Sequence, residues 1–194
     1  EGNGIPADGD LWVSYSVNKE DMWISHIPVP VEINASAHAD DDFSNNKSIA
    51  ELTDWNIYSP VWAPVSLEGQ WLKLQDKDPF DYAKVERKIP ASKELKVSFD
   101  LKAGQNDKGT LQIEFLDENG IACSRMELTD DGIFRMKGGS RFANMMKYEA
   151  GKVYHVEAVL STADRNIQVY VDGKRVGLRM FYTPVAAVER IVFR

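Results

Sequence analysis

Residues 152–176 run Lys152-Val-Tyr-His-Val-Glu-Ala-Val-Leu-Ser-Thr-Ala-Asp-Arg-Asn-Ile-Gln-Val-Tyr-Val-Asp-Gly-Lys-Arg-Val176. Apolar side chains recur at every second position on both sides of a polar turn at residues 162–166, which is typical of strands with one face on a core. Asp172-Gly173 indicates a tight turn into a third strand, because glycine adopts a positive φ without a steric penalty. The stretch predicts an antiparallel sheet and contains no catalytic motif.

Similar short patterns precede and follow this stretch. Glu94-Leu-Lys-Val-Ser-Phe-Asp-Leu-Lys-Ala103 alternates most clearly, and its leucine, valine and phenylalanine side chains are expected to point inward. Further strands are expected within residues 56–65, 71–75, 83–89, 110–116, 121–128, 133–136 and 188–194. About ten short strands without a helix long enough for a parallel crossover predict an all-β fold, an antiparallel jelly-roll sandwich over residues 55–194.

Composition excludes several classes of partner. The 194 residues carry a formal net charge of −7, which disfavours binding to nucleic acid or to an anionic membrane surface. A single cysteine, Cys123, rules out an internal disulfide. No apolar run approaches the roughly 20 residues of a membrane-spanning helix. The three histidines share no ligand spacing, and His155 is expected at the surface of its strand.

The N-terminal arm has the pattern of a β-hairpin. Residues 10–16 and 22–28 alternate around a short polar loop, and Pro28 and Pro30 then end the second strand, because proline cannot donate to a sheet ladder. Residues 34–54 are small, polar and acidic without a period, and we interpret them as a linker with a helical turn near Ile49. Within it, the run Asp40-Asp41-Asp42 lacks the spacing of a calcium loop and is interpreted as solvated.

The string Asp10-Leu-Trp-Val-Ser-Tyr-Ser-Val-Asn-Lys-Glu-Asp-Met-Trp-Ile-Ser-His-Ile-Pro-Val-Pro-Val31 resembles the closing blade of sialidase-like β-propellers with BNR-type repeats. Such proteins occur among secreted bacterial glycoside hydrolases. The resemblance covers residues 8–33 and implies that residues 1–33 are a propeller-blade hairpin whose companion blades lie upstream. It also implies a secreted, periplasmic or cell-surface location. It assigns no catalytic residue here, because the family's catalytic groups lie on several blades. Residues 55–194 resemble concanavalin-like or laminin-G-like jelly rolls in strand pattern alone.

Four aromatic residues are candidates for carbohydrate binding. Large exposed aromatic rings can stack on sugar rings, although such side chains more often pack in a core or between domains. The candidates are Trp55, Tyr58, Trp62 and Trp71.

Three carboxylates in one loop, Asp76, Asp78 and Asp81, are candidate ligands for Ca²⁺, which prefers oxygen atoms. An aspartate before proline also starts ordinary turns, and we favour that interpretation, so no cofactor is expected. The carboxylates are too close in sequence for a retaining glycosidase pair across a cleft. The segment Lys137-Gly-Gly-Ser-Arg-Phe-Ala-Asn-Met-Met-Lys147 is expected to be a long glycine-rich basic loop. Its glycines could let backbone N–H groups approach an anion, but we favour a flexible hairpin connection.

These observations predict an accessory sandwich module of a secreted carbohydrate-active protein. The module would bind a polysaccharide or glycan, or brace an upstream propeller domain, and would itself be non-catalytic. The alternative is a freestanding sandwich that binds glycan or protein and has no enzymatic partner. A laminarinase-type hydrolase would need a Glu-x-Asp-x-x-Glu strand motif, which this sequence lacks.

Overall fold

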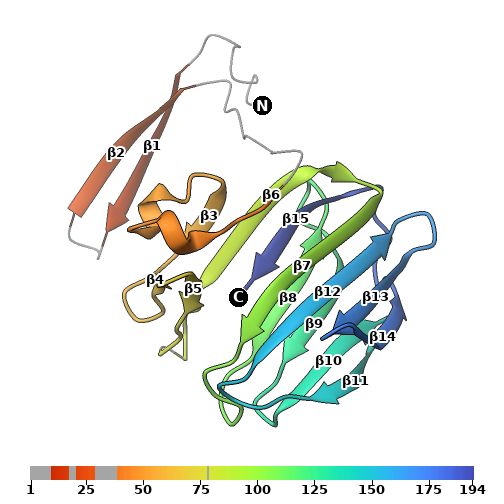
Figure 1. Ribbon diagram of the computed structural model, residues 1–194. Helices are drawn as coiled ribbons and strands as arrows, with labels where there is room; N and C mark the ends of the chain where they lie inside the picture. The colour runs from red at the N-terminus through yellow and green to blue at the C-terminus, as the bar shows by residue number, and fades with distance from the viewer. Residues whose placement is uncertain (1–9, 18–20, 29–38, 78) are drawn as a thin grey trace. The chain divides into compact units, whose positions relative to one another are not determined.

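The computed structural model describes residues 10–17, 21–28, 39–77 and 79–194 (Figure 1). The chain divides into two compact units, Glu1–Asn34 and Ala35–Arg194. In the first unit, β1 (Asp10–Val17) and β2 (Asp21–Pro28) form an antiparallel hairpin in which Asp10 lies opposite Pro28. The predicted N-terminal hairpin is therefore confirmed.

The second unit is an all-β sandwich of antiparallel sheets, as predicted. The larger sheet has seven strands in the order β11 (Arg141–Lys147), β10 (Ile133–Gly138), β9 (Ala122–Leu128), β8 (Leu111–Leu116), β15 (Val188–Phe193), β6 (Lys84–Ser92) and β3 (Trp55–Tyr58). The smaller sheet has the order β14 (Lys174–Met180), β13 (Asn166–Val171), β12 (Val153–Ser161) and β7 (Glu94–Lys102). A separate two-stranded sheet pairs β4 (Val65–Glu68) with β5 (Trp71–Leu74).

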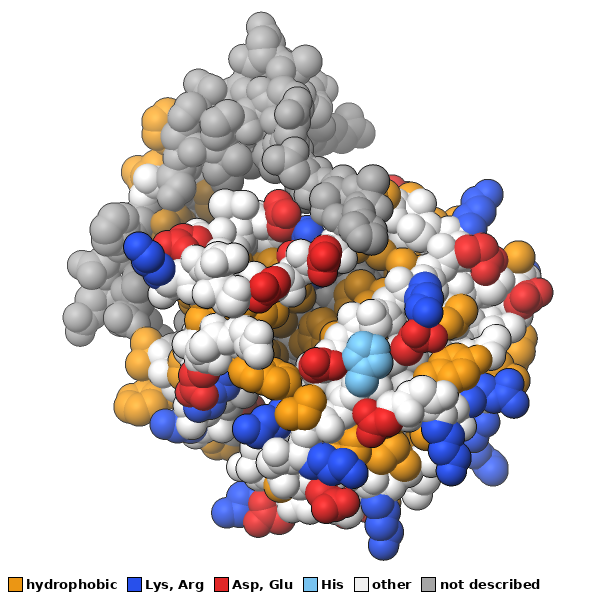
Figure 2. Space-filling model, viewed as in Figure 1, with side chains coloured by type: hydrophobic (Ala, Val, Ile, Leu, Met, Phe, Trp, Pro, Cys, Tyr) orange, Lys and Arg blue, Asp and Glu red, His pale blue; other side chains and the backbone are white. Residues whose placement is uncertain are grey.

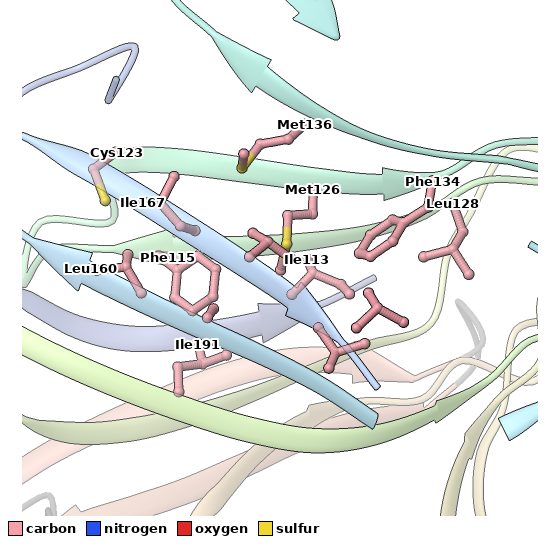
Figure 3. Packing of buried hydrophobic residues seen from close by; sticks show 14 of the residues in the cluster. Ile113, Phe115, Cys123, Met126, Leu128, Phe134, Met136, Leu160, Ile167 and Ile191 are labelled. Carbon is pink, nitrogen blue, oxygen red and sulfur yellow. The ribbon is translucent and has the colours of Figure 1, made fainter. Parts of the chain in front are cut away.

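The main core lies between the two larger sheets. Alternate residues of each strand point into it, and the largest fully buried side chains come from both sheets (Figure 3): Ile113, Phe115, Met126, Met136, Leu160 and Ile167. The side chains of β7 predicted to point inward do pack against this core: Leu95, Val97, Phe99 and Leu101. Burial of these apolar surfaces, at roughly 25 cal/mol per Å², is the principal force that holds the sheets together.

The turn between β13 and β14 has the predicted form. Asp172 and Gly173 have φ angles of 50° and 77°, so both central residues occupy the left-handed region. A two-residue turn of this kind matches the right-handed twist of the strands that it joins. The sequence signal at Asp172-Gly173 therefore sets where the last strand of the smaller sheet begins.

The segment 137–147 differs from its prediction as a long loop. Gly138 ends β10, Arg141 begins β11, and the turn between them is at Gly139 and Ser140, with Gly139 at a φ of 59°. β11 is the edge strand of the larger sheet, so it needs no continuous apolar face and gives a weak sequence pattern. The segment is therefore a hairpin connection, as favoured, but with a short turn in place of a long loop, and anion binding by it stays a prediction.

Residues 40–54 lie against the sandwich. They contain two short 3₁₀ helices, η1 (Phe43–Asn45) and η2 (Ile49–Glu51), and the second confirms the helical turn expected near Ile49. The Asp42 side chain caps η1 by accepting a hydrogen bond from the backbone N–H of Ser44 at 2.9 Å. We refer to residues 40–54 as the strap. The predicted boundaries of the linker, residues 34 and 54, stay a prediction.

The strap is held by a buried guanidinium. The side chain of Arg87, on β6, is 4% exposed, and its Nε donates to Oδ2 of Asp41 at 2.9 Å. Its Nη1 donates to the backbone carbonyl of Asp54 at 3.2 Å. A buried charge needs such partners, so Asp41 is paired rather than simply solvated.

Candidate functional site

A groove of about 300 Å³ lies on the outward side of the larger sheet. Strands β6, β15, β8 and β9 are neighbours there, and their outward side chains alternate with core residues, as Glu114 does between Ile113 and Phe115. The residues that line the groove come from these strands, from the turn between β8 and β9 and from the segment before β6: Tyr82, Lys84, Glu114, Leu116, Gly120, Ala122, Arg125, Val192 and Arg194.

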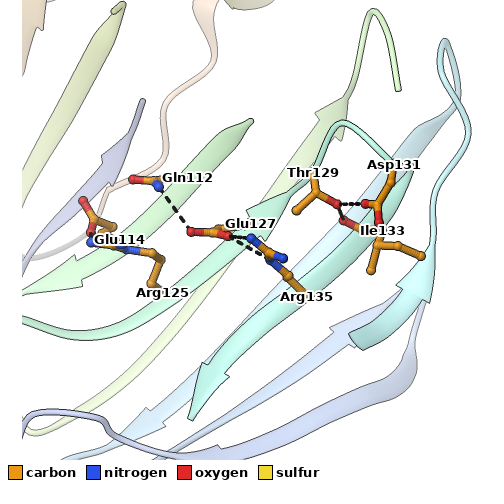
Figure 4. Close-up of polar contacts among 8 residues, drawn as sticks. All are labelled: Gln112, Glu114, Arg125, Glu127, Thr129, Asp131, Ile133 and Arg135. Carbon is orange, nitrogen blue, oxygen red and sulfur yellow. Dashed lines mark hydrogen bonds and ion pairs between the residues drawn. The ribbon is translucent and has the colours of Figure 1, made fainter. Parts of the chain in front are cut away.

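Glu114 is the central acidic group of the groove. It is 6% exposed, and its Oε1 lies 2.7 Å from Nε and 2.5 Å from Nη2 of Arg125, the residue opposite it on β9 (Figure 4). Its Oε2 lies 3.2 Å from Nε of Arg194, which follows β15. A buried carboxylate is tolerated because these two guanidinium groups compensate its charge.

A second set of charges lies beside the first. Glu86, on β6, lies 2.8 Å from the ammonium group of Lys84 and 3.4 Å from Nη1 of Arg190. The two sets together hold four cations and two carboxylates, and Asp81, beside Tyr82, adds a third carboxylate, so one positive charge is left over. This local surplus has the opposite sign to the net charge of the chain, −7.

An aromatic pair lies next to these charges. Tyr82 is 45% exposed, and its ring centroid lies 5.6 Å from that of Tyr58 and 5.9 Å from Cζ of Arg194. The Tyr58 hydroxyl donates to Oδ2 of Asp81 at 3.1 Å, and this hydrogen bond raises the pKa of Tyr58. The phenol of Tyr58 is therefore a neutral donor at physiological pH, and the exposed ring of Tyr82 offers an apolar face.

The four predicted carbohydrate-binding residues do not form one surface. Trp55 packs in a small second core. Its ring centroid lies 5.8 Å from that of Phe43 and 6.5 Å from that of Phe193. Trp62 is 66% exposed, and Trp71 is half-buried at the start of β5. Among the residues that the structure describes, no ring contact joins Trp62 or Trp71 to Tyr58. The role of these four residues in carbohydrate binding stays a prediction.

The predicted Ca²⁺ ligands are only partly described. Asp76 is exposed, Asp81 accepts hydrogen bonds from Tyr58 and from the backbone N–H of Tyr82, and Asp78 lies outside the described residues. Within the described parts of the chain, no group of three or more metal-ligating side chains comes together. The metal site formed by these three aspartates therefore stays a prediction.

The outward side of the smaller sheet has a different character. His155 is exposed there, as expected, and its Nδ1 lies 2.8 Å from Oδ1 of Asp100 on the neighbouring strand. Lys96 and Glu157 form a further exposed pair at 2.7 Å. Figure 2 shows acidic and basic side chains interspersed over the face in view. This side of the sandwich offers paired charges without a local surplus.

Sequence reasoning missed the residues of the groove. Glu114 and Arg125 are each at an outward position of a predicted strand, so the alternation of side chains predicts that both point to the same face of the sheet. The alternation does not predict their contact with Arg194, because that contact depends on β15 entering the sheet between β8 and β6. The isolated positions of Tyr82 and Lys84 before and at the start of β6 gave no signal of a site.

A family model described as Sialidase-like, CBM domain matches residues 55–194. The chain belongs to this family. The match covers the whole sandwich from β3 to the last described residue, and the groove lies within it. In the described residues of this sialidase-like CBM domain, the helices are η1 and η2 of the strap, with three residues each. Neither is long enough to cross a membrane.

The chain is also similar to solved structures. A sialidase structure is 90% identical with a TM-score of 0.87, and the match covers 100% of this chain and 18% of that chain. The sialidase-like CBM domain chain thus spans less than a fifth of that sialidase. The structure of sheep galectin-11 is 18% identical with a TM-score of 0.45, and the match covers 56% of this chain and 87% of that chain.

The carbohydrate-binding module CBM66 from Bacillus subtilis is 10% identical with a TM-score of 0.41, and the match covers 73% of this chain and 87% of that chain. Likenesses of this order say nothing about ligands. No match was found among curated proteins.

Proposed function

We propose that the sandwich is a glycan-binding accessory module of a sialidase-type glycoside hydrolase, and that this chain is itself non-catalytic. The match of residues 55–194 to the Sialidase-like, CBM domain model is the observation that carries this proposal. The groove supports it, because an exposed tyrosine ring beside fixed polar donors is suited to a sugar with an apolar ring face and hydroxyl groups. Catalysis would reside in a part of the parent protein outside residues 1–194.

The similarity to the sialidase supports the connection to an enzyme. All of this chain aligns with less than a fifth of that protein at 90% identity. An accessory module acts by holding its enzyme near the substrate, which raises the effective concentration of one for the other. A secreted, periplasmic or cell-surface location follows from the same resemblance and belongs to this proposal.

The hairpin supports an upstream structural partner. By the strand register, Trp12, Met22 and Ile24 lie on one face, and Val13 and Tyr15 lie on the other, and all five are exposed. An isolated two-stranded hairpin is marginally stable in water, and apolar side chains on both faces suit burial between neighbouring sheets. We propose that β1 and β2 belong to a propeller blade upstream of the sandwich.

A glycan array probed with the 194-residue chain tests the binding proposal. We expect binding to a defined set of glycans, confirmed by isothermal titration calorimetry. Tyr82→Ala should weaken binding by at least about tenfold, as expected when a stacking ring is lost. The matched control is Tyr170→Ala, on the outward side of the smaller sheet, which should bind as the unaltered chain does. Failure to bind any glycan would leave the module without a binding function.

A different measurement distinguishes the accessory module from the alternative, a freestanding sandwich without an enzymatic partner. Intact-mass analysis and N-terminal sequencing of the protein from its source show whether the polypeptide extends upstream of residue 1, and the sequence of such an extension shows whether it contains propeller repeats. In that longer protein, Trp12→Ser together with Ile24→Ser should lower the thermal midpoint of the upstream domain, because both side chains would lose their packing partners. An unchanged midpoint would contradict the blade assignment.

A further inference from the structure

The groove on the larger sheet carries positive charge in a chain that is negative as a whole. Three cations, Lys84, Arg125 and Arg194, line it with one carboxylate, Glu114, whereas the chain has a formal charge of −7. Like charges gathered in a hollow with a low-dielectric floor focus their potential outward. The floor here includes Val192 and Leu116, and the buried Glu114 is shared between two arginines. A local positive surplus of this kind favours an anionic ligand over a neutral one.

The arginine side chains have donors to spare. Arg125 uses its Nε and Nη2 on one oxygen of Glu114. The Nε of Arg194 lies 3.2 Å from Oε2 of Glu114 and is shielded from solvent, so it is not available to a ligand. Within the described residues, Nη1 and Nη2 of Arg194 have no hydrogen-bond partner, and these are the donors that a ligand can use. A planar guanidinium presents parallel N–H groups that match the two oxygens of a carboxylate. Glu114 therefore positions the guanidinium of Arg194 without occupying all of its hydrogen-bond donors.

The aromatic ring stands within reach of the same guanidinium. Cζ of Arg194 lies 5.9 Å from the ring centroid of Tyr82, and about half of that tyrosine is exposed. The volume of about 300 Å³ is at the lower end of the range for small-molecule pockets, which suits a short stretch of a glycan. One sugar residue can therefore touch the ring with its apolar face while a charged substituent meets the arginine.

We propose that the groove recognises a sugar residue that bears a carboxylate. The pyranose ring stacks on Tyr82, and the carboxylate accepts hydrogen bonds from Arg194, with Arg125 and Lys84 adding to the positive field. This inference rests on the proposed glycan-binding function and names its ligand class. A planar carboxylate is favoured over a tetrahedral sulfate, because a single guanidinium fork matches two coplanar oxygens.

The test is a titration of the 194-residue chain followed by amide chemical shifts. The probes are the methyl glycosides of N-acetylneuraminic acid and of glucuronic acid, with the methyl ester of the latter, methyl glucoside and glucose 6-sulfate as comparisons. We expect the two carboxylated sugars to shift the amides of Gly120, Ala122 and Arg194. Esterification removes the charge without changing the ring, so it should weaken binding by about tenfold or more.

A pair of variants tests whether Arg194 binds the carboxylate of the sugar. Arg194→Gln leaves Arg125 to compensate Glu114, so the fold should persist, and affinity for the carboxylated sugar should fall by about tenfold or more. Arg175→Gln, at an exposed position of β14 on the smaller sheet, is the matched control and should change nothing. The comparison of acid with ester needs no variant, so it remains informative if Arg194→Gln unfolds.

The outcomes separate the two proposals. Equal binding of neutral and carboxylated sugars in the groove would overturn the carboxylate inference and leave glycan binding standing. Preference for the sulfated sugar, or shifts confined to the smaller sheet, would overturn it as well. Absence of binding to these probes and to every glycan on the array would overturn the proposed function itself.

Discussion

Nε and Nη2 of Arg135 donate to the same oxygen of Glu127, at 2.9 and 2.7 Å (Figure 4). The two residues lie opposite each other on β10 and β9, and the carboxylate of Glu127 is almost completely buried. Its other oxygen accepts a hydrogen bond from Gln112 at 3.2 Å, and the ring of Phe142 lies 4.4 Å from Cζ of Arg135. The outward side of the larger sheet thus holds a third buried carboxylate besides Glu86 and Glu114, and a cross-strand arginine compensates it as Arg125 compensates Glu114.

Removal of Arg135 is expected to destabilise the sandwich strongly. Arg135→Ala leaves the charge of Glu127 buried without its partner, which costs about 3–5 kcal/mol in the free energy of unfolding. Adding Glu127→Gln should recover part of this loss, because a neutral amide is cheaper to bury. Urea denaturation measures both. The control is Lys96→Ala, whose partner Glu157 is more exposed, and it should change stability by less than about 1 kcal/mol. Equal effects of the two alanine variants would contradict the argument.

Gly177 marks a close approach between the two sheets. A Cβ at this position would lie 2.7 Å from Sδ of Met145 and 3.0 Å from Cε of Met136, both on the larger sheet. Gly177→Ala should lower the unfolding free energy by about 1–3 kcal/mol, since flexible thioether side chains can yield only partly. Gly104→Ala is the control, because nothing lies within 4 Å of its Cβ, and it should change stability by less than about 1 kcal/mol. A neutral Gly177→Ala would mean that the sheets can separate at this edge.

Burial makes Cys123 resistant to ionisation. The thiol lies in the main core, and burial raises its pKa from 9.0 to about 12. We expect iodoacetamide to label the unfolded chain rapidly at pH 9 and the native chain slowly, because only the thiolate reacts. Cys123 is the single cysteine, so the mass increase reports on it alone. Equal labelling rates in the native chain and in urea would show that the thiol is accessible.

The same shift makes the stability depend on pH. A proton is held more tightly by the folded state than by the unfolded state, so the stabilisation is complete below pH 9. It is then lost as the pH rises from 9 through about 12, where the folded state also ionises. The urea midpoint of Cys123→Ala should fall less over this range than that of the unaltered chain. Parallel pH profiles would contradict the assignment to this thiol.

The ion pair between Asp41 and Arg87 is expected to hold the strap in place. Asp41→Asn removes one charge partner of a buried guanidinium and should lower stability by about 1–3 kcal/mol. Hydrogen exchange should quicken at the amides of Leu52 and Trp55, which donate to carbonyls within the strap. Asp40→Asn, at an exposed neighbouring position, should stay within about 0.5 kcal/mol. Unchanged exchange in Asp41→Asn would show that the ion pair between Asp41 and Arg87 does not hold the strap.

Local patterns were enough to predict the fold class. Alternation of side chains along β7 and β12 depends only on the period of an extended chain, so the inward positions of Val97 and Val156 followed from the sequence. The turn at Asp172-Gly173 is equally local, because it depends on which residues tolerate a positive φ. β11 was missed because an edge strand need not be apolar on either face.

The sequence by itself determined the strands, their inward faces and the tight turns, because each depends on neighbouring residues. Only the tertiary structure decided which outward side chains meet. Glu114 gains Arg194 because β15, the last strand, enters the larger sheet beside β8, and no local pattern encodes that neighbour. Likewise, Trp55 faces a small core while Tyr82 faces the groove, since an aromatic residue suits either environment until the sheet order assigns it one.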